Sequence, residues 1–405
     1  MAHKRDIDQY LSDLMDSVGP LTPVVTPVLD SNPLSHVAED IQAALPIPKF
    51  DNSAVDGFAV LTTDLQGNGA PWTFPVVGDT PAGAAPQSIS LGQAIRVMTG
   101  GPVPLSSAAL TVIPVELTNA PADHSLPDEI TINQHPGGRD NIRIEGEHLH
   151  IGDSAVSAQT PLDAGTVATL ISVGVSEVSA HPCPRVTVIT TGDELATSNK
   201  WGIPNSNGPM LMAELQRLGI QNPRCMHTHD DVGALAEVFD QSAKESDLII
   251  TVGGISAGAF DVVKALGAQA GGFEFFPVAM QPGKPQGHGR WKGTKVVCLP
   301  GNPVAAWVSF RLFIIPVINR LGGAKRVDWM SELPAVQLRT PRALPAREGT
   351  VLAIPVEIDW ATQTAHSVAH RSHMVGALAG CAGIALVSGE SVPEGGLCHV
   401  VLGRI

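Results

Sequence analysis

The segment from Asp247 to Leu266 limits the possible fold more than any other part of this 405-residue chain. Residues 248–252 form a β-branched, apolar run, which is typical of a strand buried on both faces. The run ends at Gly253 and Gly254, and the spacing of the following apolar residues predicts a helix. Glycine lets the backbone approach a ligand, and the first N–H groups of a helix point outward, so such a junction favours anions. The segment therefore predicts a strand of an α/β sheet that ends either in an anion site or in a tight turn whose Asp261 caps the following helix.

Other parts of the chain repeat this order of strand, turn and helix. We expect a strand at 185–190, helices at 210–218 and 232–243, and a further strand at 296–299 that leads into a helix at 305–321. This alternation is typical of a parallel sheet covered by helices on both sides. Ligands of such sheets lie beyond the carboxyl ends of the strands, so the turns should share one edge.

Acidic residues are concentrated in these turns. They are Asp193, Glu194, Asp230, Asp231 and Asp261. Some of them could cap helices or tether loops, but a carboxylate beside a bound phosphate requires a divalent cation between the two. Adjacent residues at a strand end point to opposite faces, so one of Asp193 and Glu194 should face the ligand and the other should tether the loop. The pattern leaves open which of Asp230 and Asp231 faces the ligand, and it predicts Mg²⁺ bridging a phosphorylated ligand.

The regions before and after this sheet predict smaller elements. Apolar residues from Ile7 to Val18 recur with helical spacing, and residues 22–28 favour a strand. Residues 49–60 predict a loop that presents Asp, Asn and Ser side chains, whereas the pattern from Trp72 to Glu116 predicts strands. In that second stretch, Thr99 stands in a glycine turn that could bind an anion.

Two further stretches complete this outline. Residues 141–152 alternate in polarity and predict a two-faced strand with His148 and His150 on its solvated face, rather than a metal site. Residues 323–405 predict a small β-rich domain with a helix at 372–380.

Composition excludes several classes of function. The formal net charge of −14 argues against nucleic acid or an anionic membrane as the main partner. The five cysteines are scattered and odd in number, so they indicate neither a disulfide framework nor a zinc site. There is no signal peptide and no apolar run long enough to span a bilayer, which predicts a cytoplasmic protein.

Seven segments occur in the order and at the spacings typical of one enzyme family. They are FDNSAVDGFAV at 50–60, RVMTGGPVP at 96–104, NIRIEGE at 141–147, TTGDEL at 190–195, VGGISAGAFD at 252–261, QPGKPQ at 281–286 and LPGNPVA at 299–305. Together they resemble the molybdopterin molybdenumtransferases, a family that includes the E domain of gephyrin. The resemblance covers nearly the whole chain.

The resemblance implies a multidomain α/β fold. Its domains would be a discontinuous linking and dimerisation domain (1–44 and 141–180), a β-rich insert (45–140), an α/β molybdopterin-binding domain (181–322) and a C-terminal β-rich domain (323–405). It also implies an elongated homodimer whose active cleft is completed across the subunit interface.

The same resemblance implies a reaction and a set of site residues. Members insert molybdate into adenylated molybdopterin and release AMP with the help of Mg²⁺, so a molybdopterin adenylyltransferase is a candidate partner. The implied catalytic residues are Asp56, Thr99, Glu194, Asp230, Asp261 and Lys284, with Glu194 and Asp261 as Mg²⁺ ligands. The implied ligand-lining residues are Gly253, Gly254, Ser256, Gly258, Gln281, Pro300, Gly301, Asn302 and Pro303.

The chain departs from the family pattern at two positions. Many relatives carry basic residues where this chain has Pro277 and Gln281, which leaves Lys284 as the nearby ammonium; Arg290 or Lys292 could substitute. Two alternative functions therefore stay open, namely molybdopterin adenylyltransferase and a pterin-binding scaffold without activity. The segments at 50–60 and 96–104, which the smaller adenylyltransferases lack, argue against the first.

Overall fold

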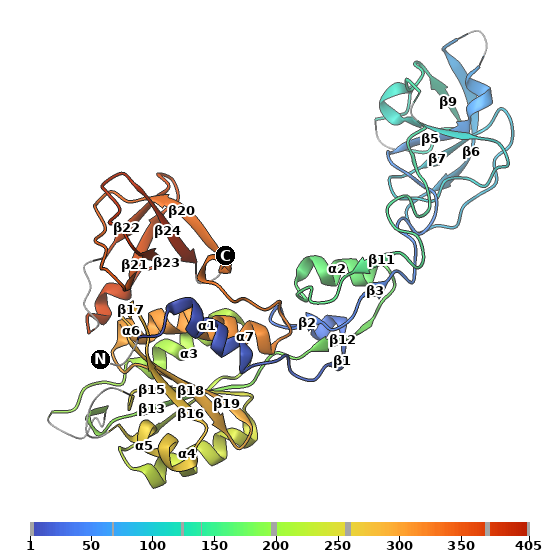
Figure 1. The fold of residues 1–405 in the computed structure, drawn as a ribbon. Helices are drawn as coiled ribbons and strands as arrows, with labels where there is room; N and C mark the ends of the chain where they lie inside the picture. Colours follow the sequence, from blue (N-terminus) through green and yellow to red (C-terminus); the bar gives the residue numbers. More distant parts are fainter. Residues whose placement is uncertain are drawn as a thin grey trace. The chain divides into compact units, whose positions relative to one another are not determined.

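The computed structural model describes residues 4–66, 69–122, 125–138, 140–195, 201–255, 261–368 and 373–402 (Figure 1). Contacts divide the chain into two compact units. Unit 1 comprises Met1–Glu39, Ala158–Ala164 and Glu177–Ile405, and unit 2 comprises Asp40–Ser157 and Gly165–Ser176. This partition is coarser than the four domains expected from the sequence, which remain a prediction.

The main sheet of unit 1 has six strands in the order β14-β13-β15-β19-β18-β16. The strands are β13 (Val186–Thr191), β14 (Arg224–Thr228), β15 (Leu248–Val252), β16 (Phe273–Pro277), β18 (Pro285–Trp291) and β19 (Thr294–Leu299). The first four in the sheet order are parallel, whereas β18 and β16 extend the edge in antiparallel pairing. The predicted strands at 185–190, 248–252 and 296–299 are confirmed as β13, β15 and β19.

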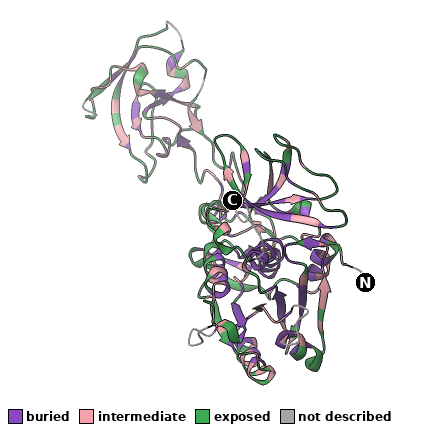
Figure 2. Cartoon of the chain, turned by 90° about the vertical axis from the view of Figure 1, so that its left-hand side faces the viewer, coloured by how far each residue is buried: buried purple, intermediate pink, exposed green. Residues whose placement is uncertain are grey.

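Helices cover both faces of this sheet. They are α1 (Ile7–Asp16), α3 (Asn207–Leu218), α4 (Val232–Glu245), α5 (Val262–Ala270), α6 (Pro303–Ser309), the π-helical segment η5 (Phe310–Ile314) and α7 (Ile315–Leu321). Ile249 packs into a core with α4 and α5, while Ile250 packs into a second core with α1, α3 and α6 to α7. Adjacent strand residues point to opposite faces, so one strand supplies both buried cores, visible in purple in Figure 2.

The continuous helical segment from Pro303 to Leu321 matches the helix predicted at 305–321. Among the described residues it is the one helix long and apolar enough to cross a membrane, and 83% of its apolar window is buried within the protein. Burial of that extent is typical of a core helix.

The C-terminal strands close into a ring. They are β20 (Ala335–Arg339), β21 (Val351–Asp359), β22 (Thr364–Ser367), β23 (Gly383–Val387) and β24 (Leu397–Leu402), with β17 (Met280–Gln281) paired to β21. Because β21 pairs with both β22 and β23, the ring β21-β22-β20-β24-β23 returns to its start. In place of the helix predicted at 372–380, the structure has the short 3₁₀ helix η7 (Val375–Leu378), and Ser372 lies outside the described residues.

A separate sheet in unit 1 has the order β1-β12-β2. Its strands are β1 (Val24–Pro27), β12 (Glu177–His181) and β2 (His36–Val37). The strand predicted at 22–28 is therefore confirmed as β1, which forms an outer edge of this sheet.

Unit 2 is built on a five-stranded sheet in the order β8-β5-β7-β6-β9. The strands are β5 (Gly57–Leu61), β6 (Trp72–Thr80), β7 (Ala94–Val97), β8 (Leu110–Pro114) and β9 (Glu129–Ile132). Two short pairs, β4 (Asn52–Ser53) with β10 (Ile142–Arg143) and β3 (Ile41–Gln42) with β11 (Ser154–Val156), and helix α2 (Ala164–Ser172) complete the elements.

Two predictions for unit 2 are wrong. Residues 57–60 lie in the buried strand β5 rather than in a loop, and a Cβ on Gly57 would lie 2.0 Å from the carbonyl oxygen of Ile113 on the neighbouring strand. The glycine that looked like a loop residue thus permits close strand pairing. The strand predicted over 141–152 is limited to β10, because the chain turns at Gly146 with a φ of +73°, so His148 and His150 do not share a strand face.

Candidate active site

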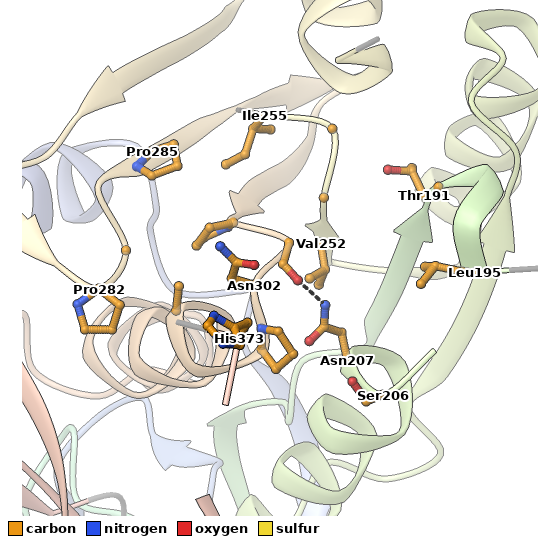
Figure 3. A pocket seen from close by; sticks show the side chains of 18 of the residues that line it. Thr191, Leu195, Ser206, Asn207, Val252, Ile255, Pro282, Pro285, Asn302 and His373 are labelled. Atoms are coloured by element: carbon orange, nitrogen blue, oxygen red, sulfur yellow. Dashed lines mark hydrogen bonds between the residues drawn. The ribbon is translucent and has the colours of Figure 1, made fainter. Parts of the chain in front are cut away.

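A cavity of about 980 Å³ in unit 1 lies at the carboxyl ends of β13, β15 and β19 (Figure 3). Because these strands are parallel, the turns that follow them meet at one edge of the sheet. Most of the predicted site residues line this cavity: Glu194, Asp230, Gly253, Gly254, Asp261, Gln281, Lys284, Pro300, Gly301, Asn302 and Pro303. Ser256 and Gly258 lie outside the described residues.

The turn at Gly253 and Gly254 brings backbone into the cavity wall. The two residues have φ values of +99° and +64°, in the left-handed region that favours glycine. A Cβ on Gly254 would lie 2.9 Å from Cγ2 of Val263, so a side chain would push against the start of α5. The N–H of Gly253 donates to the carbonyl of Leu299 at 3.1 Å, which ties the turn to the end of β19.

Asp261 precedes α5 without capping it. Its side chain makes no capping hydrogen bond to the described first turn, and its carboxylate lies 3.6 Å from Nζ of Lys264. Asp261 therefore does not serve as a hydrogen-bonding cap of α5. It is one of the residues that line the cavity.

Asp193 and Glu194 divide their roles as the strand-end geometry predicts. Asp193 Oδ1 accepts a hydrogen bond from the N–H of Asp230 at 3.2 Å and lies 3.1 Å from Nδ1 of His229, so it ties two loops together. Glu194 lines the cavity.

The structure also distinguishes the next acidic pair. Asp231 accepts a hydrogen bond from the N–H of Ala234 at 2.7 Å and caps the N-terminus of α4. Asp230 lines the cavity. Of the two residues that the sequence could not tell apart, Asp230 is therefore the one placed to meet a ligand.

Lys284 is held in place by the backbone of its loop. Its carbonyl accepts from the N–H of Val278 at 2.7 Å. Just before it, the carbonyl of Gly283 accepts from Nε2 of buried Gln286 at 2.7 Å, and the same Nε2 donates to Oγ of Ser309 at 2.6 Å. This loop is anchored on both sides, which fixes the backbone of Lys284 at the cavity wall.

Arg347, which the sequence reasoning did not assign to the site, contacts the polar residue of this loop. Its Nη1 donates to Oε1 of Gln281 at 2.6 Å. The suggestion that Arg290 or Lys292 substitutes for a missing cation is wrong. Arg290 lies opposite Lys295 in the antiparallel pairing of β18 with β19, near the start of β19 and therefore at the end of the strand away from the cavity. Lys292 forms an ion pair with Asp240 at 2.8 Å.

Asn207 is the main lining residue that the sequence analysis missed. Its Nδ2 donates to the carbonyl of Gly301 at 2.6 Å, the bond drawn as a dashed line in Figure 3. The helix was predicted over 210–218, but α3 begins at Asn207, since proline is well tolerated in the first turn of a helix. Applying this rule to Pro209 would have brought Asn207 to the start of α3.

A buried ion pair connects the helices that carry these residues. Glu214 of α3 accepts from Arg311 Nη2 at 3.0 Å and from Trp307 Nε1 at 2.9 Å. Burial alone would raise the pKa of Glu214, but Arg311 and Arg217 reverse this effect and lower it. Glu214 is therefore held ionised between α3 and the helix that begins at Pro303, which fixes two walls of the cavity relative to each other.

Asp56 and Thr99 lie in unit 2 and contact each other. Oδ1 of Asp56 accepts from the backbone N–H of Thr99 at 2.7 Å and from its Oγ1 at 2.8 Å. Both residues are on the surface of the unit, at the start of β5 and after β7. A surface carboxylate held by two donors from one turn is a preorganised polar group.

Comparison with known proteins identifies the family. Family models match residues 5–174, described as "MoeA N-terminal region (domain I and II)", and residues 187–320, described as "Probable molybdopterin binding domain". Molybdopterin molybdenumtransferase 2 of Mycobacterium tuberculosis (strain CDC 1551 / Oshkosh) is 36% identical over 332 residues, which are 79% of this chain and 80% of that relative. This chain belongs to the molybdopterin molybdenumtransferase family.

Other members of the molybdopterin molybdenumtransferase family agree with this assignment. The molybdopterin molybdenumtransferase of Staphylococcus aureus (strain Mu50 / ATCC 700699) is 32% identical over 317 residues, covering 75% of this chain and 73% of that one. The crystal structure of the molybdopterin biosynthesis MoeA protein from Pyrococcus horikoshii OT3 superposes with a TM-score of 0.78 at 23% identity, covering 99% and 100% of the two chains. The resemblance inferred from seven motifs and the multidomain α/β fold are both confirmed.

Proposed function

We propose that this chain inserts molybdate into adenylated molybdopterin and releases AMP. The proposal rests on one observation, the convergence of Glu194, Asp230, Asp261 and Lys284 on a single cavity. Relatives that span most of the chain at 36% and 32% identity are named as molybdopterin molybdenumtransferases. The cavity, at about 980 Å³, lies at the upper end of the range of small-molecule sites and can hold a ligand that carries two ring systems.

The chemistry requires charge neutralisation and an oriented nucleophile. AMP is released when the phosphoanhydride bond between the adenylate phosphate and the molybdopterin phosphate breaks. A molybdate oxygen attacks one phosphorus of this bond and ends on the released phosphate, while the two dithiolene sulfurs of molybdopterin bind molybdenum and a second molybdate oxygen leaves as water. Lys284 provides an ammonium for the phosphate charge, and the glycine turn at Gly253 and Gly254 lets the backbone approach the ligand closely.

Mg²⁺ fits this set of donors as an ion that arrives with the phosphates. Mg²⁺ is commonly bound by one or two carboxylates together with phosphate oxygens and water. Glu194 and Asp261 line the cavity, while no three His, Cys, Asp or Glu side chains within the described ranges are grouped closely enough to hold a metal by themselves. When bound, Mg²⁺ would neutralise phosphate charge beside Glu194 and Asp261.

A homodimer is supported by an exposed apolar edge. Val24 and Val25 of β1 are 49% and 71% exposed, and Leu29 just after the strand is 81% exposed. Apolar side chains on an unpaired sheet edge are typical of an interface. We expect sedimentation equilibrium to give the mass of a dimer, and Val25→Lys to shift it toward the monomer. The mass of a monomer for the wild type would overturn this part of the proposal.

A defined reaction mixture separates this function from its two alternatives. We would incubate the purified chain with adenylated molybdopterin, Mg²⁺ and molybdate and quantify AMP by chromatography. AMP release that depends on molybdate supports the transferase, and ATP consumption with free molybdopterin indicates an adenylyltransferase. Tight binding without turnover indicates a scaffold. A transferase located in the cytoplasm would receive its substrate from a molybdopterin adenylyltransferase, the proposed partner.

Variants of the two proposed Mg²⁺ ligands test the role of the carboxylates. Glu194→Ala and Asp261→Ala should reduce AMP release by about 100-fold or more, because the phosphate charge loses its counter-ion. Circular dichroism should show an unchanged fold, since neither side chain is needed to cap a described helix. Full turnover in both variants would show that neither Glu194 nor Asp261 is needed to hold Mg²⁺.

A further inference from the structure

Two buried side chains of the cavity wall each carry a polar atom that is unpaired among the described residues. Asn207 is 9% exposed and Thr191 is 4% exposed, and both line the cavity. Across the described part of the chain, neither Oδ1 of Asn207 nor Oγ1 of Thr191 has a hydrogen-bond partner. A buried polar atom left unpaired costs free energy, so such atoms in a cavity wall point to a ligand.

The orientation of the Asn207 amide is fixed. Its Nδ2 donates to the carbonyl of Gly301 at 2.6 Å, and a flipped amide would place two oxygens against each other. Oδ1 is therefore the atom of the amide that is left unpaired, and Figure 3 shows the Asn207 and Thr191 side chains among those that line the cavity. Oδ1 is a pure acceptor, so its partner must be a hydrogen-bond donor.

This requirement excludes the anionic parts of the proposed substrates. Phosphate and molybdate oxygens are acceptors and would be repelled by Oδ1, so they belong near Lys284 rather than here. Adenylated molybdopterin has donors of two kinds, the hydroxyls of the adenylate ribose and the N–H groups of its heterocycles. The heterocycle donors, chiefly the 2-amino group and ring N–H of the pterin and the 6-amino group of the adenine, are the ones that a specificity site can use to distinguish one ring system from another.

We propose that Asn207, together with Thr191, forms a specificity subsite that recognises an amino group on a heterocycle of the ligand. This proposal rests on the proposed function, since it assumes that the cavity receives the pterin nucleotide. Asn207 Oδ1 accepts the amino N–H, and the Thr191 hydroxyl, which can donate or accept, pairs with the adjoining ring atom. A site built to hydrogen-bond an amino group rejects an analogue with a carbonyl in its place, because two acceptors then face each other.

Matched pairs of small ligands test this subsite directly. Pterin and lumazine differ by exchange of the 2-amino group for a carbonyl, and AMP and IMP differ by the same exchange at position 6. We expect the full-length wild type to bind the amino member of at least one pair about tenfold or more tightly in calorimetric titrations. The pair that is discriminated identifies whether the pterin or the adenine occupies the subsite.

In Asn207→Ala, the ratio of the affinities for the amino ligand and for its carbonyl counterpart should fall close to one. Asn205→Ala is the matched control, because Asn205 also supports the start of α3, donating to Thr190 Oγ1 at 2.8 Å and accepting from the N–H of Gly208 at 3.1 Å, but does not line the cavity. A purely structural role for Asn207 would weaken both members of a pair equally and leave the ratio unchanged. That result, or no preference for either amino ligand in the wild type, would overturn the proposal.

Thr191→Val provides a second test that does not depend on folding defects. Replacing an unpaired buried hydroxyl with a methyl group of the same shape should leave the melting temperature unchanged or raise it. The same variant should bind the preferred amino ligand several-fold more weakly. A lower melting temperature with unchanged affinity would contradict the subsite.

The outcome is separable from that of the proposed function. Molybdate-dependent AMP release by the wild type together with an unchanged ratio in Asn207→Ala would overturn only the subsite. Loss of the ratio in Asn207→Ala without any AMP release would support the subsite and overturn the transferase.

Discussion

Arg347 donates a hydrogen bond from Nη1 to Oε1 of Gln281, with the two atoms 2.6 Å apart. Arg347 belongs to the segment just before β21, and Gln281 lines the active-site cavity. The contact orients the Gln281 amide and holds a guanidinium next to a residue of the cavity wall. Arg347 does not itself line the cavity, so we expect its charge to act on a bound anion from just outside the wall.

We expect Arg347→Ala to raise the KM for molybdate about three- to tenfold, since the cavity would lose a positive charge near an anionic substrate. The effect on the melting temperature should be small, because the hydrogen bond is on the surface. Arg339→Ala is the matched control, as Arg339 is a surface arginine of the same closed sheet that donates to the carbonyl of Gly395. An equal KM in Arg347→Ala and Arg339→Ala would show that Arg347 does not serve the site.

The neighbouring residues Asp230 and Asp231 should give opposite phenotypes. Asp231→Ala removes the cap of α4 and should lower the free energy of unfolding by about 1 kcal/mol while AMP release persists. Asp230→Ala removes a carboxylate from the cavity and should reduce AMP release at least tenfold at nearly unchanged stability. Urea titrations and AMP assays on both variants check this. Reversed phenotypes would assign the cavity role to Asp231.

The contact between Asp56 and Thr99 predicts a functional surface on unit 2. Thr99→Val keeps the backbone N–H bond to Asp56 but removes the hydroxyl bond, and Asp56→Asn keeps the shape while removing the charge. If the charge matters, Asp56→Asn should lower kcat for AMP release tenfold or more, and Thr99→Val should have a smaller effect. Circular dichroism should show an intact fold in both. A normal kcat in Asp56→Asn would show that the contact between Asp56 and Thr99 only stabilises the turn.

A buried lysine predicts how stability depends on pH. Lys295 is 2% exposed, lies 3.2 Å from Nδ1 of His288 and donates to Ser17 Oγ. Burial lowers the pKa of Lys295 to about 7, and Arg290 contributes to the same shift. Between that value and the ordinary lysine pKa, the unfolded chain binds more protons than the folded chain, so the free energy of unfolding rises with pH in this window.

We therefore expect Lys295→Met to lose this part of the pH dependence. Between pH 7.5 and 9, the slope of the unfolding free energy should be lower in the variant by roughly 1 kcal/mol per pH unit. Lys292→Met is the control, because Lys292 is mostly exposed and pairs with Asp240 at the surface. Burial also lowers the pKa of His288 to about 4, so stability should fall in both proteins as the pH drops from 6.5 to 4. Identical slopes above pH 7.5 would contradict the buried, neutral state of Lys295.

Local pattern was enough to predict much of the fold. The apolar run at 248–252 and its double glycine define β15 and its turn, and helical spacing places α1 and α4, because these signals depend only on neighbouring residues. Gly57 misled the analysis, since a glycine that permits close strand pairing has the same composition as a loop glycine.

The missed parts of the site depend on contacts between distant residues. The contact from Arg347 to Gln281 and the bond from Asn207 to Gly301 join residues 66 and 94 positions apart, and no local pattern encodes either. The choice between Asp230 and Asp231 depended on which one capped α4. The position of the acidic turns at one edge of the sheet, in contrast, followed from the rule that ligands lie beyond the carboxyl ends of parallel strands, so their convergence was predictable.

The most direct test is a single-turnover reaction in which AMP and pterin-bound molybdenum are quantified in the same sample. With purified chain, adenylated molybdopterin, Mg²⁺ and molybdate, we expect one AMP for each molybdenum bound to the pterin, and neither product when molybdate is omitted. AMP release at the same rate without molybdate, or with no molybdenum on the pterin, would contradict the proposed transfer.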